Sequence, residues 1–205
     1  MSLLVLYKFR SLDNFQFVLD ILVNQRMYAT TFDKMNDPME GFYTSDGDIP
    51  QASIEALEQH QKSLKFCSLS KYYNNPLMWA HYGNGCRGVA IGVEFKESGD
   101  DMREVIYGSH SHLNSSKPTT IERAKDVLSF KADFWQYEDE IRVFANNGNF
   151  IPVRVKELIF GERADRTQKS LLKKIVQAAN PSVEIIEWDD SMSYVHSQPV
   201  FKAGT

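Results

Sequence analysis

Apolar and polar residues alternate along this chain in short blocks that predict strands and helices in turn. Residues 3–9 form a β-prone apolar run typical of a buried strand. Ser11 can cap a helix over residues 12–24, whose apolar positions recur with helical spacing. The same patterns predict further helices at residues 51–62, 76–82, 119–128 and 166–179, and strands at residues 26–31, 64–69, 88–95, 104–107, 138–145, 154–160 and 183–188.

Turn signals separate these blocks. Residues 33–40 are rich in turn formers, and residues 146–149 are rich in Asn and Gly. The polar segment 108–118, which holds His110 and His112, is expected to be the most mobile. The last strand–helix–strand series predicts a βαβ unit. Without an internal repeat or a linker, we expect one α+β domain over residues 1–205.

Composition narrows the class of protein. The 205 residues are 42% hydrophobic and 24% charged, as in soluble globular proteins. No apolar run approaches the roughly 20 residues of a membrane helix, and no signal peptide is evident, so we expect a cytoplasmic protein with free thiols at Cys67 and Cys86. The net charge of −4 argues against a general nucleic-acid coat protein, although it permits one local contact.

The most informative stretch is residues 135–142. Glu138 and Glu140 would share one face of a strand, where two carboxylates repel each other unless a cation, a substrate or a shared proton is near. A solvated acidic turn is the alternative. Trp135 and Tyr137 indicate partial burial instead, and Arg142 follows directly, so this stretch is a candidate site.

Two earlier strands end in polar residues. Arg10, close to Tyr7, could hold a phosphate through its planar guanidinium, or it could be a surface cation. Ser68 and Ser70 share a strand face and could orient a ligand or a carboxylate, or bond locally. The Gly-x-Ser-x-Gly motif is absent, so Ser68 is not expected to be a hydrolase nucleophile.

Two further motifs supply candidates for a cleft. Asn36, Asp37 and Glu40 either form a structural turn or face a ligand. The helix over residues 76–82 carries residues that suit either ring stacking on a ligand or ordinary core packing, and these are Trp79, His81 and Tyr82.

A metal site is the competing interpretation of these acidic and imidazole groups. Oxygen and nitrogen ligands could come from Asp37, Glu40, His81, Glu138 and Glu140. No two histidines have helical metal-binding spacing, and His-Glu-x-x-His is absent. The pair His110 and His112 is a weak signal. We therefore expect no metal.

In these motifs the chain resembles the bacterial family known as domain of unknown function 2971. The resemblance extends over residues 4–188 and rests on Leu6-Tyr7-Lys8-x-Arg10, Asn36-Asp37-Pro38-x-Glu40, Cys67-Ser68-x-Ser70, Met78-Trp79-x-His81-Tyr82, Trp135-x-Tyr137-Glu138-x-Glu140-x-Arg142 and Leu158-Ile159-Phe160-Gly161. The name of that family implies no activity.

The chain also resembles, more weakly, ADP-ribosyltransferases of the arginine–serine–glutamate type. Those enzymes carry an early strand arginine, a Ser-x-Ser strand and a Glu-x-Glu turn in this order, matched here by Arg10, by residues 68–70 and by residues 138–140. The resemblance implies a split, mostly antiparallel mixed β-sheet flanked by short helices, with NAD as co-substrate in the cleft. The middle residue of the serine motif lacks a hydroxyl, and the motifs at 36–40 and 78–82 have no place in this template.

The resemblance also implies roles. Arg10 would hold the pyrophosphate of NAD, and Ser68 would fix the nicotinamide ribose and support Glu140. Tyr82 or Tyr137 would stack on the nicotinamide. Glu140 would stabilise the oxocarbenium-like transition state, and Glu138 would orient or deprotonate the acceptor.

The leading hypothesis is thus an ADP-ribosyltransferase-like enzyme that acts on nucleic acid or protein, in the manner of a toxin or phage-defence effector. The alternatives are a non-catalytic module that binds a nucleotide or a protein, and a metal-assisted phosphodiesterase or nuclease. A nucleotide is the expected small-molecule partner and a membrane is not. The acceptor and the oligomeric state stay open.

Overall fold

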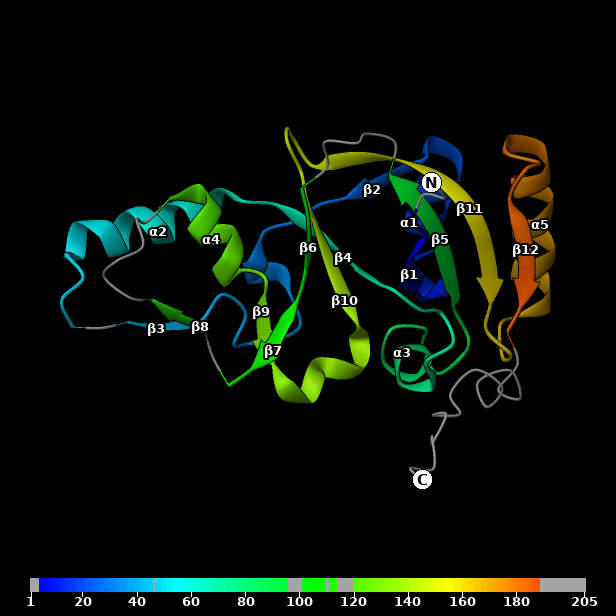
Figure 1. Cartoon of the computed structure of the whole chain (residues 1–205). Helices are drawn as coiled ribbons and strands as arrows, with labels where there is room; N and C mark the ends of the chain where they lie inside the picture. The colour runs from blue at the N-terminus through cyan, green and yellow to red at the C-terminus, as the bar shows by residue number, and fades with distance from the viewer. Residues whose placement is uncertain (1–3, 46, 96–100, 110, 114–119, 189–205) are drawn as a thin grey trace, which may run out of the picture.

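The structure, a computed structural model, describes residues 4–45, 47–95, 101–109, 111–113 and 120–188. These residues form an α+β fold with one large, mostly antiparallel sheet and several helices (Figure 1). No helix in these ranges is both long enough and apolar enough to cross a bilayer.

The large sheet has the strand order β12-β11-β5-β1-β4-β10-β6, and β2 also pairs with β11. These strands are β1 (Leu6–Arg10), β2 (Arg26–Tyr28), β4 (Phe66–Ser70), β5 (Val89–Phe95), β6 (Asp101–Glu104), β10 (Glu140–Phe144), β11 (Phe150–Phe160) and β12 (Glu184–Glu187). Only β11 and β12 are parallel, and α5 (Arg166–Ala179) connects them, which confirms the predicted βαβ unit. Two small parallel pairs join β3 (Tyr43–Ser45) to β8 (Ser111–Leu113) and β7 (Ile106–Gly108) to β9 (Phe130–Ala132).

The sheet opens between β1 and β4. Each strand is paired along its whole length on its other side, β1 with β5 and β4 with β10. To each other they are joined by one registered pair, Tyr7 with Ser70. Further along, the opening is closed by Thr30, whose backbone bonds that of Phe66 at 2.9 and 3.0 Å. The sheet therefore consists of two groups of strands with a gap at the joint.

Helices cover the two faces of this sheet unequally. On one face, Leu6 and Ile91 lie in the same apolar core as α5 and α1 (Phe15–Asn24). On the other, α3 (Pro76–His81) packs at one end through Trp79, whereas α2 (Gln51–Ser63) and α4 (Ile121–Val127) form a separate core with Phe66 at the opposite end (Figure 1). Three buried polar side chains of β4 and β10, those of Ser70, Glu140 and Arg142, belong to neither of these cores.

Local capping agrees with the sequence. The Ser11 hydroxyl accepts a bond from the Asp13 amide at 3.1 Å and starts η1 (Leu12–Asn14), a 3₁₀ turn that leads into α1. Asn75 accepts from the Leu77 amide at 2.9 Å, with Pro76 in the first helical position of α3. The helix start at Pro76 is confirmed, whereas Ser11 caps the 3₁₀ turn and the α-helix itself begins only at Phe15.

The prediction of a strand from residue 138 is wrong at its start. Asp133–Glu138 form a 3₁₀ helix, η3, and β10 begins at Glu140. Between them Asp139 has a φ of 44°, in the left-handed region, and this turns the chain sharply. Glu138 and Glu140 therefore do not lie on one strand face, and the period-two argument for their proximity fails.

Other strands also begin or end at different residues than predicted. The strand expected at 26–31 is shorter, because β2 ends at Tyr28, and the strand expected from 154 begins earlier, at Phe150. The strand expected at 104–107 is divided at Val105, because the chain changes its partner there: β6 pairs with β10, whereas β7 pairs with β9. The polar segment 108–118 contains β8, while His110 and the remainder after Leu113 lie outside the described residues.

Candidate functional site

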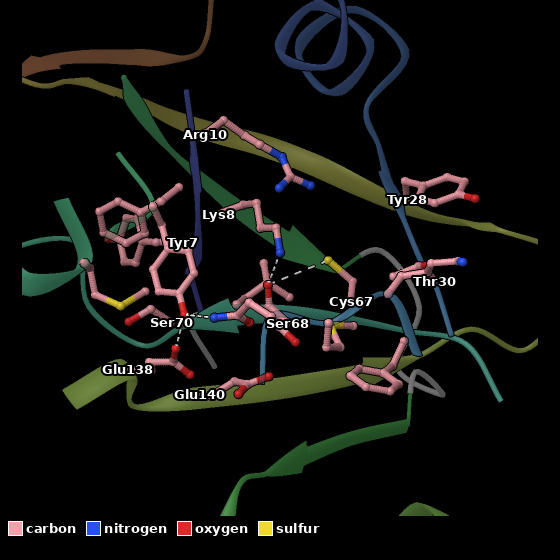
Figure 2. A pocket seen from close by; sticks show the side chains of 18 of the residues that line it. Tyr7, Lys8, Arg10, Tyr28, Thr30, Cys67, Ser68, Ser70, Glu138 and Glu140 are labelled. Atoms are coloured by element: carbon pink, nitrogen blue, oxygen red, sulfur yellow. Dashed lines mark hydrogen bonds between the residues drawn. The ribbon is translucent and has the colours of Figure 1, made fainter. Parts of the chain in front are cut away.

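A cavity of about 280 Å³ occupies the opening between β1 and β4 (Figure 2). This volume is close to the lower end of the ~300–1,000 Å³ that ligand pockets span. Of the residues singled out in the sequence, the structure brings together around it Tyr7, Arg10, Asn36, Glu40, Ser68, Ser70, Tyr82, Glu138 and Glu140. The candidates that do not line it are Asp37, Trp79, His81, Trp135, Tyr137 and Arg142.

One wall of the cavity is a cluster of carboxylates and cations. Lys131, on β9, is buried and forms ion pairs with Glu138 and, at 3.2 Å, with Glu140. Arg142 bonds the other oxygen of Glu140 through its Nε at 2.9 Å. The like charges expected to repel each other are thus held together by two buried cations.

Glu140 is the most strongly held of these carboxylates. Its side chain is only 3% exposed, and burial alone would raise its pKa. The charges of Arg142 and Lys131 and a hydrogen bond from Ser68 outweigh burial and hold the pKa of Glu140 well below its usual range. Glu140 is therefore ionised at every physiological pH.

Glu138 behaves in the opposite way. Burial raises the pKa of its carboxyl, and the nearby charge of Glu140 raises it further, against the lowering effect of Lys131. The Tyr82 hydroxyl donates to one Glu138 oxygen and accepts a bond from the Asn36 amide at 2.8 Å. Glu138 thus takes up a proton more readily than an ordinary glutamate, as a general base requires.

The facing wall carries two cations of β1. Lys8 donates from its Nζ to the Ser68 carbonyl at 2.6 Å, across the opening. Arg10 points into the same opening (Figure 2), and its Nε is buried without a hydrogen-bond partner among the described residues. In those residues neither cation has a carboxylate within 4.0 Å. Burial lowers the pKa of both.

The motif at residues 36–40 serves both of the purposes considered for it. Asp37 accepts a bond from the Met39 amide at 2.9 Å, which is the structural turn. Glu40 is buried, lines the cavity and bonds Nη2 of Arg142 at 2.9 Å. Arg142 therefore lies behind the carboxylates and links Glu40 to Glu140.

Among the aromatic and imidazole candidates for ring stacking, some pack away from the cavity and one lines it. Trp79 is fully buried and stacks on Trp188 with ring centroids 4.9 Å apart, which is core packing. His81 is exposed and contacts the ring of Tyr137 at 5.7 Å, away from the cavity. The expectation that Tyr137 could stack on a ligand in the cleft is therefore wrong for this cavity, and Tyr82 is the aromatic candidate in position.

Trp135 also lies outside the cavity but contributes to it indirectly. The Lys131 ammonium sits 4.9 Å from the centre of its ring, a cation–π distance. Trp135 thus packs against the cation that holds both glutamates. Its role is support of that cation.

Sequence analysis missed two residues of the site. Lys8 had a detectable signal, because it lies two positions before Arg10 and so shares its strand face. Lys131 had none, since it stands alone in the short strand β9 and reaches the glutamates only through the tertiary fold. In the part of the chain that the structure describes, no three His, Cys, Asp or Glu residues are grouped to hold a metal ion.

Comparison with known proteins gives no relative for this chain. No protein-family model, no curated protein and no solved structure matches it. The two resemblances stated from the sequence motifs stay predictions, and the function has to be argued from the site.

Proposed function

We propose that the chain is an ADP-ribosyltransferase-like enzyme that cleaves NAD and transfers ADP-ribose to a nucleic-acid or protein acceptor. The observation that carries this proposal is the meeting of Arg10, Ser68 and Glu140 around one cavity at a split in the sheet. They come from three strands far apart in the sequence. The resemblance expects the same residue types, in the same order, around one cleft.

The charges of the cavity fit this chemistry. Unpaired cations on β1 suit a pyrophosphate, and the ionised Glu140 opposite suits the positive charge that develops on the ribose as nicotinamide leaves. The C–N bond to nicotinamide breaks, and the acceptor nucleophile forms the new bond to the ribose. Glu138, whose pKa is raised mainly by burial, accepts the proton that the nucleophile gives up.

Glu140 must release a bond for this step. Its oxygens already receive donors from Arg142, Lys131 and Ser68, and a carboxylate has about four acceptor positions. The longest of the printed contacts are those from Lys131 at 3.2 Å and from Nη2 of Arg142 at 3.3 Å. We expect Lys131 to shift toward Glu138 when a ribose hydroxyl binds Glu140.

Because the acceptor positions of Glu140 are already filled by protein donors, a second candidate is also favoured: a module that binds a nucleotide without cleaving it. In such a module the carboxylates would only stabilise the wall, and the cations Arg10 and Lys8 would bind phosphate. The two candidates share a ligand and differ in turnover.

Nicotinamide release separates them. Purified protein is incubated with NAD, with and without candidate acceptors, and nicotinamide is measured by chromatography. Loss of the Glu140 charge in Glu140→Gln is expected to lower the rate by ~10²–10³. Glu104→Gln, an exposed residue of β6 outside the cavity, is the matched control and should keep the wild-type rate.

Two results would contradict the proposal. If NAD binds in calorimetry but no nicotinamide is released under any acceptor condition, the chain is the non-catalytic binding module. Release that proceeds at the wild-type rate in a folded Glu140→Gln protein removes Glu140 from the mechanism. Circular dichroism verifies that each variant is folded.

A further inference from the structure

The two partly buried cations of β1, Lys8 and Arg10, differ from the buried cation Lys131 that lines the same cavity. Lys131, on the opposite wall, is neutralised by two glutamates. Lys8 donates a hydrogen bond to the uncharged Ser68 carbonyl, and the buried Nε of Arg10 has no hydrogen-bond partner in the part of the chain described. A partly buried cation without a counter-ion is disfavoured, so the presence of two such cations indicates an anionic ligand.

The geometry allows one anion to reach both. Lys8 and Arg10 are alternate residues of β1, on one strand face and about 7 Å apart along the strand. Both line the same cavity (Figure 2). Lys8 is bonded across the opening to β4, so an anion that enters the gap meets its ammonium directly.

We propose that Lys8 and Arg10 together bind the pyrophosphate of the ligand. Lys8 then exchanges its bond to the Ser68 carbonyl for one to a phosphate oxygen. This inference rests on the proposed function, because it takes a dinucleotide as the ligand of the same cavity. It adds Lys8 as a second specificity-determining residue and makes binding depend on pH.

The surroundings of Lys8 lower the pKa of its ammonium group. Burial is the largest cause that lowers its pKa, and the charge of Arg10 on the same strand lowers it further. Cys67 on β4, Glu140 on β10 and Glu138 in η3 also face it and act in the opposite direction without cancelling the effect. Two negative phosphates next to the amine favour its charged form, so the pKa rises on binding.

Calorimetry with ADP-ribose tests this inference. Its two phosphates are fully ionised from neutral pH upward, so a change of affinity with pH in this range comes from the protein. The affinity of the full-length wild type should fall as the pH is raised from neutral and Lys8 loses its proton. Adenosine, which lacks phosphate, should bind at least about tenfold more weakly.

Three variants assign the pH dependence to Lys8. Lys8→Met should bind ADP-ribose about tenfold or more weakly near neutral pH, and its affinity should not fall as the pH rises. Lys8→Arg, which stays charged, should recover affinity without this pH dependence. Arg10→Met should lose affinity and keep the pH dependence, because Lys8 remains.

The outcomes keep this inference apart from the proposed function. ADP-ribose binding that needs Lys8 and Arg10, without NAD cleavage, supports the inference and contradicts only the proposed chemistry. Cleavage of NAD together with unchanged affinity in Lys8→Met overturns the inference alone. Equal affinity for adenosine and ADP-ribose also overturns it, and so does the same fall of affinity with rising pH in Lys8→Met.

Discussion

Glu138 and Glu140 lie two residues apart, and their surroundings shift their titration in opposite directions. Arg142 and Lys131 lower the pKa of Glu140 against the effect of burial, while burial raises that of Glu138. A carboxyl with a lowered folded-state pKa stabilises the fold above its unfolded pKa and loses that contribution as the pH falls. A raised pKa has the reverse effect, and its contribution is lost as the pH rises.

The first prediction follows from these signs. From about pH 3 to about pH 8, the wild type should gain stability relative to Glu140→Gln, mostly near the ordinary glutamate pKa. Over the same range it should lose stability relative to Glu138→Gln. Urea unfolding at each pH measures both differences, and each variant is the control for the other. If the two differences in unfolding free energy changed with pH in the same direction, the opposite pKa shifts of Glu138 and Glu140 would be contradicted.

The second prediction concerns the cation between the two glutamates. Lys131→Met leaves two buried carboxylates with one cation fewer and should cost about 3–5 kcal/mol of unfolding free energy near neutral pH. Lys71→Met breaks an ion pair with the exposed Glu104 and should cost no more than about 1 kcal/mol. Equal losses in urea unfolding would show that Lys131 does not hold this wall.

At the scale of elements, the junction between η3 and β10 determines how the two glutamates face the cavity. Asp139 ends η3 in a left-handed conformation, and its carbonyl accepts a bond from the Lys71 amide at 3.1 Å. A straight strand would direct Glu138 and Glu140 to one face. The turn instead directs them to Lys131 from two different elements.

The third prediction tests this turn. Asp139→Gly should keep or slightly increase the unfolding free energy, because glycine adopts a positive φ without strain. Asp139→Val should lower it by about 1–2 kcal/mol, because a β-branched side chain is disfavoured there. Thermal and urea unfolding of both variants measure the effect. A valine variant as stable as the glycine variant would contradict the left-handed assignment.

At the scale of the whole molecule, two groups of strands meet at an opening that only a few contacts close. Tyr7 and Ser70 pair at one end, and Thr30 bonds Phe66 at the other. Between them the Lys8 side chain crosses to β4. A ligand in this opening would join the two groups as well as fill the cavity.

The fourth prediction is therefore a pattern of hydrogen exchange. With ADP-ribose bound, amides in β1 and β4 should exchange more slowly, because the ligand occludes the opening and suppresses its fluctuations. Amides of α5, which packs away from the cavity, should be unchanged and serve as the internal control. Mass spectrometry of peptides measures both. Protection confined to α5 would indicate a different binding site.

The sequence by itself determined most of the elements and several members of the site. Capping at Ser11 and Asn75, the helical apolar stripes and the βαβ unit depend on neighbouring residues, so local patterns predicted them. Arg10 and Ser68 were found because each occupies a strand, where the alternation of side chains is readable.

Only the tertiary structure decided how these residues meet. The opening between β1 and β4 depends on which strands pair and where pairing stops, and the ion pairs to Lys131 and Arg142 depend on elements that approach only after folding. Glu40 and Arg142, for example, are 102 positions apart. Local periodicity carries no information about such long-range contacts, because burial and charge pairing act through space. Which cations are neutralised and which are left for a ligand is thus a property of the fold.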